Sequence, residues 1–481
     1  MAFRVLFLPE NISLKTDGSL DLLTLARQAG YLIDSQCDGQ GTCGRCRVHL
    51  VSGALADERD NRIEFQTIPL KDILSCLAYP CSDVEVLVPP ESRVGEVITS
   101  STDYSPLLQQ SPALLFTFQK IDIKLPRPTL QDSCSDADRI TRELKKRYHG
   151  EIHFSGDFFS TLPNQLRQSD WHITLHALDC DNRLNIISST DDDRSAYGWA
   201  VDIGTTTLAV ALVDMEDGAV VDLASSANPQ ISRGADVISR MIACEKKGAL
   251  PSLTKAVRDR IAGLQQALLA GNDIAADDVI AAAVSGNTTM LHLYHGVNPV
   301  YLRKEPYIPA FTSFPAIPAR DRDMVCASGA LLFTCPSVAS YVGGDITAGA
   351  VAAGIDLADD VVLFIDLGTN GEIVIGNKEW ALCASTSAGP CFEGGGITCG
   401  MRAERGAIYA ADWDEANKKL IPHTLRDEKA RGLCGSGLFE SIAVLFQNGA
   451  IDRSGRLNKD FPGVKENAEK EWYYVLDTGD N

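Results

Sequence analysis

Hydrophobic and polar positions alternate over short runs in the first 92 residues, a pattern typical of a small α+β domain. Strand-like runs of apolar residues occur at positions 3–8, 48–51 and 84–88. Apolar residues at helical spacing over residues 20–29 predict one helix, which Gly30 ends. We therefore expect residues 1–92 to fold as one compact domain.

The pattern weakens after this first domain. Residues 93–128 contain scattered serine and proline with little periodicity, so we expect a linker there. Residues 129–195 predict a small α/β middle domain, with a charged helix at 136–148 and a strand at 171–178. We find no residues in this middle domain that indicate a chemical role.

From Trp199 onward, strands alternate with helices and Gly, Ala, Val and Ile become frequent, as in an α/β domain. One pattern occurs twice in this part of the chain, which spans residues 196–481. Residues 200–207 read Ala-Val-Asp-Ile-Gly-Thr-Thr-Thr, and residues 364–371 read Phe-Ile-Asp-Leu-Gly-Thr-Asn-Gly. Each copy is an apolar strand that runs into Asp-x-Gly-Thr and then into a second apolar strand. The repeat predicts a duplicated, two-lobed α/β domain.

The two halves of this duplication differ in length. The aspartates of the two copies, Asp202 and Asp366, are 164 residues apart, whereas 115 residues separate Asp366 from Asn481. The second half is thus shorter by about 50 residues. We expect the second lobe to be incomplete and the chain to be a fragment or a truncated product.

Four cysteines in the first domain have the spacing of an iron–sulfur site. Cys37, Cys43 and Cys46 form a C-x5-C-x2-C motif, and Cys76 follows after 29 intervening residues. Four thiolates suit a 2Fe-2S cluster, which takes two per iron, and the glycines among them let the backbone approach the sulfur atoms closely. The sequence therefore predicts a 2Fe-2S cluster held by these four residues.

Other interpretations of these cysteines are a structural zinc site or chance cysteines in a loop. Zinc favours paired C-x2-C knuckles, but Cys76 lies in an apolar run with no cysteine two residues before it. Cys81 competes for the position of the fourth ligand. We prefer Cys76, because the following strand then starts at the expected distance.

The composition of the chain indicates which classes of partner and which cellular compartment to expect. The formal net charge of −20 would repel phosphate backbones and anionic membrane surfaces, so we expect neither nucleic acid nor a membrane as a partner. No stretch approaches 18 uninterrupted apolar residues, and the apolar run at the start is too short for a signal peptide. We therefore expect a cytoplasmic protein whose 14 cysteines are free thiols or metal ligands.

The duplicated Asp-x-Gly-Thr motif suits metal and phosphate binding. A carboxylate at the end of a strand can hold a Mg²⁺-bound water, while N–H groups and hydroxyls of the next turn contact phosphate oxygens. One copy is weak evidence, since the same residues make ordinary hairpin turns, but two copies favour a nucleotide gripped from both sides. The residues that we assign are Asp202 with Gly204, Thr205 and Thr206, and Asp366 with Gly368, Thr369 and Asn370.

With these motifs, residues 199–481 resemble the actin, sugar-kinase and heat-shock-chaperone ATPase superfamily, known as ASKHA. The two motifs resemble its phosphate loops, which implies ATP with Mg²⁺ as the ligand and the two aspartates as its catalytic carboxylates. Gly344 and Asp345 lie in a run similar to the connecting helix region. Gly435 and Gly437 lie in a run similar to a glycine turn near the adenosine.

The order of the parts resembles the reductive activators of corrinoid proteins over nearly the whole chain. These proteins have a β-grasp ferredoxin domain, a linker, a small middle domain and an ASKHA domain. Further runs that match this family lie at residues 228–240, 285–290 and 388–403. The resemblance implies that ATP is consumed while the cluster reduces an inactive Co(II) corrinoid on a partner protein to Co(I).

Coupling to ATP is physically reasonable for such a reaction. Plant-type clusters lie near roughly −400 mV, and the strongly reducing Co(I) state lies below what such a cluster easily supplies. Nucleotide-driven closure of two lobes can favour a corrinoid state that accepts the electron. The partners implied are the corrinoid protein and an upstream electron donor, and a homodimer is left open.

Two alternatives use the same parts differently. One is an ASKHA kinase with the ferredoxin domain as a sensor, although we assign no base carboxylate for a sugar, because Asp202 and Asp366 are committed to the metal. The other is a ferredoxin-type electron carrier with a nucleotide-dependent docking module. ATPase activity that depends on a corrinoid protein would separate the activator from both.

Overall fold

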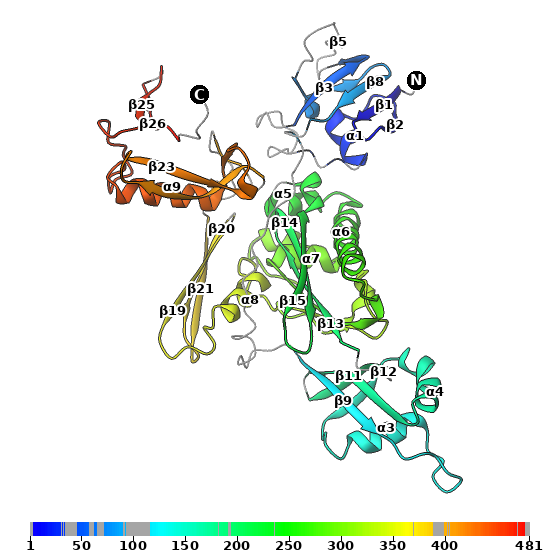
Figure 1. Ribbon diagram of the computed structural model, residues 1–481. Coiled ribbons are helices and arrows are strands. Elements are labelled where there is room, and N and C mark those ends of the chain that lie inside the picture. Colours follow the sequence, from blue (N-terminus) through cyan, green and yellow to red (C-terminus); the bar gives the residue numbers. More distant parts are fainter. Residues whose placement is uncertain are drawn as a thin grey trace. The chain divides into compact units, whose positions relative to one another are not determined.

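The computed structural model describes residues 3–29, 31, 33, 46–56, 62–64, 72–89, 92, 116–180, 182–190, 194–234, 236–368, 370–387, 399–401, 403, 405–468 and 470–476 (Figure 1). The chain divides into two compact units. One comprises residues 1–99, 366–372 and 386–481, and the other comprises residues 100–365 and 373–385. Among the described residues, no helix is both long and apolar enough to cross a lipid bilayer.

The N-terminal domain is a five-stranded sheet with one helix (Figure 1, blue). The strand order is β2-β1-β8-β3-β6. The elements are β1 (Phe3–Leu8), β2 (Ile12–Thr16), α1 (Leu22–Gln28), β3 (Arg47–Ser52), β6 (Asp72–Leu74) and β8 (Val84–Leu87). Asp21 starts the helix by accepting a hydrogen bond from the Thr24 amide at 2.9 Å, as an N-cap does. A smaller sheet joins β5 (Arg62–Glu64), β4 (Ala54–Ala56) and β7 (Tyr79–Pro80).

A second, four-stranded sheet has the order β10-β12-β11-β9 (Figure 1, cyan). Its elements are β9 (Thr117–Lys124), α3 (Asp136–Leu144), β10 (Glu151–Phe154), α4 (Phe158–Gln168), β11 (His172–Cys180) and β12 (Arg183–Thr190). Strand β9 lies within the stretch 93–128 that we expected to be a linker. It is an edge strand that pairs with β11 along its whole length, and all but one of its residues are partly or fully exposed. The apolar pattern of β9 is weak for that reason. The strand is defined by its pairing with β11, which its own sequence does not indicate.

The largest sheet has the order β15-β14-β13-β16-β18-β17. Its strands are β13 (Tyr197–Ile203), β14 (Thr207–Asp214), β15 (Val220–Ala227), β16 (Val279–Gly286), β17 (Ile317–Pro318) and β18 (Leu331–Thr334). Strand β16 runs parallel to both β13 and β18. The carboxyl ends of these three strands therefore meet at one edge, which is where open α/β sheets bind ligands.

Helices pack against this sheet. Helix α6 (Ala249–Asn272) buries Leu253, Val257 and Ile261, spaced one turn apart, in the core of the sheet. Helix α7 (Thr288–His295) follows β16 directly and is buried throughout, and α5 (Val237–Ala243) precedes α6. Helix α8 (Gly344–Ala352) leads toward the second copy of the repeat.

The second copy forms the predicted pair of strands. Strands β19 (Val362–Leu367) and β20 (Asn370–Gly376) are neighbours in a three-stranded sheet completed by β21 (Ala381–Ser387). The elements that follow are β22 (Ala407–Asp414), β23 (Lys419–Thr424), β24 (Gly432–Leu433), α9 (Gly435–Gln447), β25 (Val464–Glu466) and β26 (Trp472–Tyr474). Helix α9 packs on β22 and β23 through a small core that includes Ala411, Leu420 and Leu445.

Candidate functional sites

Two of the four predicted cluster ligands meet in the N-terminal domain. Cys46 directly precedes β3, and Cys76 lies in the 3-10 turn Ser75–Leu77. Their Sγ atoms lie 3.3 Å apart, and both side chains are buried in the core of the domain. The Ser75 amide donates to the Cys46 carbonyl at 2.8 Å and holds the two segments together. Cys37 and Cys43 lie outside the described residues.

This pair fits a shared metal. A disulfide needs about 2.05 Å between its sulfurs, whereas two sulfur ligands on one tetrahedral metal lie about 3.8 Å apart. The observed 3.3 Å excludes a disulfide and is close to the ligand spacing. Cys81 follows β7 and donates its amide to the Ala54 carbonyl, so Cys76 is the cysteine that contacts Cys46.

A buried hydroxyl lies beside the pair. Ser75 is fully buried, and its Oγ has no hydrogen-bond partner in the part of the chain that the structure describes. A buried hydroxyl without a partner is costly, whereas sulfur atoms of a cluster accept hydrogen bonds. The residues present therefore fit a cluster, with Ser75 as a candidate donor to it.

The first Asp-x-Gly-Thr copy lies at the carboxyl edge of the largest sheet. Asp202 is near the end of β13, and its exposed carboxylate accepts a hydrogen bond from the Ser285 hydroxyl of β16 at 3.0 Å. The two residues are opposite each other in the register of the parallel strands. Gly204, Thr205 and Thr206 form the turn into β14, as the sequence predicts.

The carbonyl groups of this turn are held from one side. The side-chain Nδ2 of Asn228 donates to the Gly204 carbonyl at 2.8 Å. The backbone N–H of Asn228 donates to the Thr206 carbonyl, also at 2.8 Å. The guanidinium of Arg240, a fully buried residue of α5, donates to the Thr205 carbonyl. In a trans peptide the next N–H points the opposite way. The amides of Thr205 and Thr206 therefore point away from these partners, as a phosphate loop requires.

Two helix N-termini come close together at the same edge. A Cβ on Gly343, the residue before α8, would lie 2.4 Å from the Cα of Asn287, the N-cap of α7. A Cβ on Gly344 would lie 2.5 Å from the Cys335 carbonyl. Glycine is required at both positions, because any side chain would push α8 away. Helix N-termini carry partial positive charge, which favours an anion here.

Asp345 and Asp202 both lie near the Cys335 thiol, at the end of β18. Burial raises the pKa of the Cys335 thiol to about 11, and the carboxylates of Asp202 and Asp345 add to the effect. The two predicted acidic residues are thus close enough to the end of β18 to act on one thiol. The Asp345 carboxylate also accepts a hydrogen bond from the Ile346 amide at 2.9 Å.

The second copy lies at the turn between β19 and β20. Asp366 is half-buried near the end of β19, and burial raises the pKa of its carboxyl group. The Gly368 amide donates to the carbonyl of Asn370, the first residue of β20, at 2.9 Å. Thr369 lies outside the described residues.

The glycines at the start of α9 have a packing role in the structure. A Cβ on Gly437 would lie 1.9 Å from the Ile408 carbonyl of β22, so the helix can pack this closely only on a glycine. Gly435 is the first residue of the helix, after Cys434 as N-cap. Their proposed place near the adenosine remains a prediction.

Sequence analysis gave no role to Ser285, Asn287, Asn228 and Arg240, although all four lie in runs that match the family. Asn287 donates to the Thr205 hydroxyl at 3.1 Å. These contacts cross between distant segments, so spacing along the chain does not reveal them.

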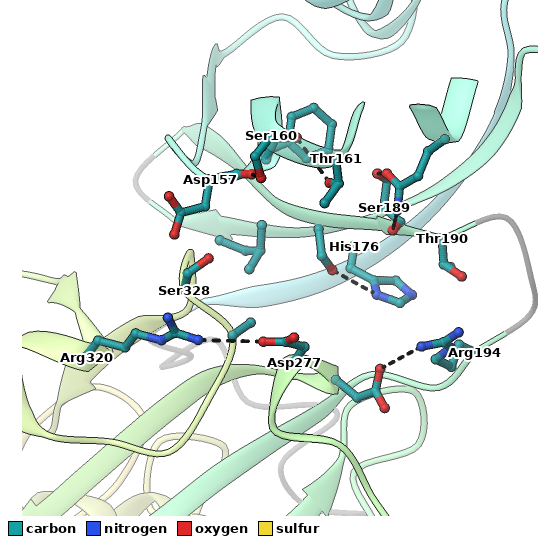
Figure 2. Close-up of a pocket in the computed structure, with 16 residues that line it drawn as sticks. Asp157, Ser160, Thr161, His176, Ser189, Thr190, Arg194, Asp277, Arg320 and Ser328 are labelled. Carbon is teal, nitrogen blue, oxygen red and sulfur yellow. Dashed lines mark hydrogen bonds and ion pairs between the residues drawn. The ribbon is translucent and has the colours of Figure 1, made fainter. Parts of the chain in front are cut away.

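A separate polar cavity of about 480 Å³ lies between the four-stranded sheet and the largest sheet (Figure 2). His176 lines it and is 4 % exposed, and burial lowers the pKa of its imidazole. Arg194 lies 3.7 Å from Asp278, and Arg320 lies 3.6 Å from Asp277. Each of these two arginines thus has a carboxylate beside it, and we assign no ligand to this cavity.

These features define a protein that joins an iron–sulfur domain to a nucleotide-binding fold. Models of known protein families match both the iron–sulfur part and the nucleotide-binding part of the chain. The model of the 2Fe-2S iron-sulfur cluster binding domain matches residues 8–81. The models of the RACo linker region, the RACo middle region and the C-terminal domain of RACo, the ASKHA domain, match residues 114–193, 197–358 and 360–481.

Comparison with individual proteins points to the same family as the family models do. A solved structure of a reductive activator for corrinoid, iron-sulfur protein is 34% identical with a TM-score of 0.66, and the match covers 98% of this chain and 77% of that chain. The corrinoid activation enzyme RamQ of Eubacterium limosum is 27% identical, over 99% of this chain and 78% of RamQ. A Co(II) methylated amine-specific corrinoid protein reductase of Methanosarcina barkeri is 25% identical over 142 residues, which is 25% of this chain and 26% of that protein.

The chain therefore belongs to the family of reductive activators of corrinoid proteins. This confirms the fold classes predicted from the sequence, including the ferredoxin-type domain and the ASKHA domain.

Proposed function

We propose that this chain reduces a Co(II) corrinoid bound to a partner protein to Co(I), with one electron passed through a 2Fe-2S cluster and with ATP hydrolysed to ADP and phosphate. The proposal is supported by two converging buried cysteines and by an Asp-x-Gly-Thr turn whose carbonyls accept hydrogen bonds from Asn228 and Arg240, in one chain of this family. An upstream one-electron donor reduces the cluster again after each transfer.

The N-terminal domain supplies the electron-transfer site. Cys46 and Cys76, with Cys37 and Cys43, would hold the cluster, which when bound takes up and releases one electron at a time. The apolar core around Cys46 and Cys76 keeps bulk water from the sulfurs, and the Ser75 hydroxyl would donate a hydrogen bond to a sulfur of the bound cluster.

The first loop supplies the phosphate and metal site. Asp202, oriented by Ser285, would hold a water of Mg²⁺, while the amides of Thr205 and Thr206 contact phosphate oxygens. Asp366, Gly368, Thr369 and Asn370 would act in the same way from the second copy. Burial raises the pKa of the Asp366 carboxyl group, and a cation bound beside the carboxylate would lower this pKa again.

A single-turnover experiment tests this function. The reconstituted protein is reduced, freed of excess reductant, and mixed anaerobically with a Co(II) corrinoid protein, with and without Mg-ATP. We expect Co(I) to form only with ATP, with one cluster oxidised for each Co(I) formed. The Cys46→Ala and Asp202→Asn variants should form none.

Two outcomes would contradict the proposal. Co(I) formation at the same rate without ATP would make the chain a plain electron carrier. ATP hydrolysis that ignores the corrinoid protein, with transfer of phosphate to a small molecule, would favour the kinase alternative. Light scattering on the same sample tests the homodimer that the sequence left open.

A further inference from the structure

We propose that Asn287 sets the direction of the hydrogen bond at Thr205, so that the Thr205 hydroxyl is held as a donor for a phosphate oxygen of the nucleotide. The inference rests on the proposed nucleotide site at the first loop and assigns a positioning role to Asn287. It follows from which atoms can donate and which can accept.

The orientation of the Asn287 amide is determined by helix α7. Its Oδ1 accepts a hydrogen bond from the Met290 backbone N–H at 3.0 Å, as expected for an N-cap residue. A backbone N–H can only donate, so the oxygen of the amide must lie on that side. The Nδ2 atom therefore faces Thr205, and its distance to the Thr205 Oγ1 is 3.1 Å.

An amide nitrogen has no lone pair to accept with, so the Thr205 oxygen must be the acceptor in this contact. A threonine hydroxyl has one hydrogen, which then cannot point at Asn287. Thr205 is only half-buried, and its carbonyl is held on the inner side by Arg240. The hydroxyl hydrogen is therefore available to a ligand that can only accept, which describes a phosphate oxygen.

Close packing keeps Asn287 in this position. Gly286, with a φ of +156°, lies so near β13 that a Cβ would be 2.8 Å from the Ile203 carbonyl. On the other side, a Cβ on Gly343 would be 2.4 Å from the Asn287 Cα. The backbone at Asn287 thus lies close to two other segments, and its side chain is held by the hydrogen bonds to Met290 and Thr205.

Two substitutions at position 287 separate capping from hydrogen-bond direction. Asn287→Asp keeps an equally good N-cap, but its second oxygen can only accept, so the Thr205 hydroxyl would donate to it and turn away from the phosphate. Asn287→Ser also keeps a cap, but its side chain is too short to reach Thr205. Thr205→Val removes the hydroxyl at nearly constant shape.

The measurement is the affinity for Mg-ATP by calorimetry on the full reconstituted chain. We expect Thr205→Val and Asn287→Asp each to weaken binding by at least about tenfold, the range for a hydrogen bond to a charged group. Asn287→Ser should have a smaller effect of about threefold, since the hydroxyl is then free to rotate. In the T205V background, N287D should reduce the affinity for Mg-ATP clearly less than it does in the parent protein, because the hydroxyl through which residue 287 acts is absent.

The outcomes separate this inference from the proposed site. An equal loss from N287D in both backgrounds would overturn the inference, since Asn287 would then act by charge or by fold alone. Unchanged affinity in T205V, or no nucleotide binding by the parent chain, would overturn the assignment of the loop and the inference with it. Unchanged unfolding midpoints and cluster absorbance for both Asn287 variants establish that the fold is intact.

Discussion

Individual polar side chains distinguish the two candidate sites. Beside the cysteine pair, the Ser75 hydroxyl is enclosed in the core without a partner among the described residues. At the first Asp-x-Gly-Thr turn, the side chains of Ser285, Asn287 and Asn228 have defined hydrogen-bond partners. The Ser75 hydroxyl can therefore donate a hydrogen bond to a bound cluster. The side chains at the turn, in contrast, already make their hydrogen bonds within the protein.

Removing the Ser75 hydroxyl is expected to change the cluster potential. A hydrogen bond to sulfur stabilises the reduced cluster, which carries more negative charge, so Ser75→Ala should shift the reduction potential to a more negative value. A redox titration followed by electron paramagnetic resonance measures the shift. Ser337→Ala, which removes a buried hydroxyl from another domain, is the matched control. An unchanged potential in Ser75→Ala would mean that the hydroxyl does not reach the sulfurs.

Acid is expected to destabilise the core around His295. Burial lowers the pKa of this imidazole to about 3, with Arg322 and Arg258 adding to the effect, whereas the unfolded chain titrates near 6.5. The folded state thus keeps His295 neutral while the unfolded state takes up a proton. Its stabilisation is complete above about pH 6.5 and is lost as the pH falls toward 3.

Urea unfolding between pH 7 and pH 4 tests this pH dependence. The free energy of unfolding should fall by up to about 1.4 kcal/mol per pH unit for this histidine. His295→Gln keeps a donor and an acceptor for Thr334 and Arg322 but does not titrate, so its profile should be flatter by that slope. Parallel profiles for the two proteins would contradict the assignment.

At the scale of elements, the spacing of cysteines and the two Asp-x-Gly-Thr turns were visible in the sequence because each is local. Asp202 lies near the end of β13, and Gly204 and Thr205 lie in the turn that follows, as predicted, for that reason. Strand β9 was missed, because an edge strand exposes many of its side chains and is defined by its partner β11. The support of the loop by Ser285 and Asn287 depends on β16 lying beside β13, which no short pattern encodes.

Two glycines in helices are expected to respond to alanine in opposite ways. At Gly437 a Cβ would meet the Ile408 carbonyl at 1.9 Å, so Gly437→Ala should force α9 away from β22 and destabilise the fold by roughly 1–3 kcal/mol. At Gly263, in the middle of α6, a Cβ would meet nothing within 4 Å. Gly263→Ala should therefore stabilise by roughly 0.5–1 kcal/mol through the lower entropy of the unfolded chain. Urea unfolding of both variants measures the difference, and equal effects would contradict the close packing at α9.

At the scale of the whole molecule, the two sites belong to separate hydrophobic cores. The core that contains Cys46 and Cys76 is built from residues between Val5 and Val88, and the core beside the first Asp-x-Gly-Thr turn is built from residues between Trp199 and Leu332. A segment with its own core can keep its fold when a distant site is lost. The two activities should therefore be separable by substitution.

Cys46→Ala is expected to remove the cluster absorbance while the affinity for Mg-ATP stays within about twofold of the parent, a change smaller than one hydrogen bond. Asp202→Asn should do the reverse, leaving the cluster spectrum unchanged and weakening the binding of Mg-ATP. Both variants should fail to form Co(I), because electron transfer to the corrinoid needs both sites. A loss of nucleotide affinity of tenfold or more in Cys46→Ala would mean instead that cluster assembly and the nucleotide fold are energetically coupled. The coupling would then be present before any corrinoid protein binds, and ATP would act on the cluster domain directly.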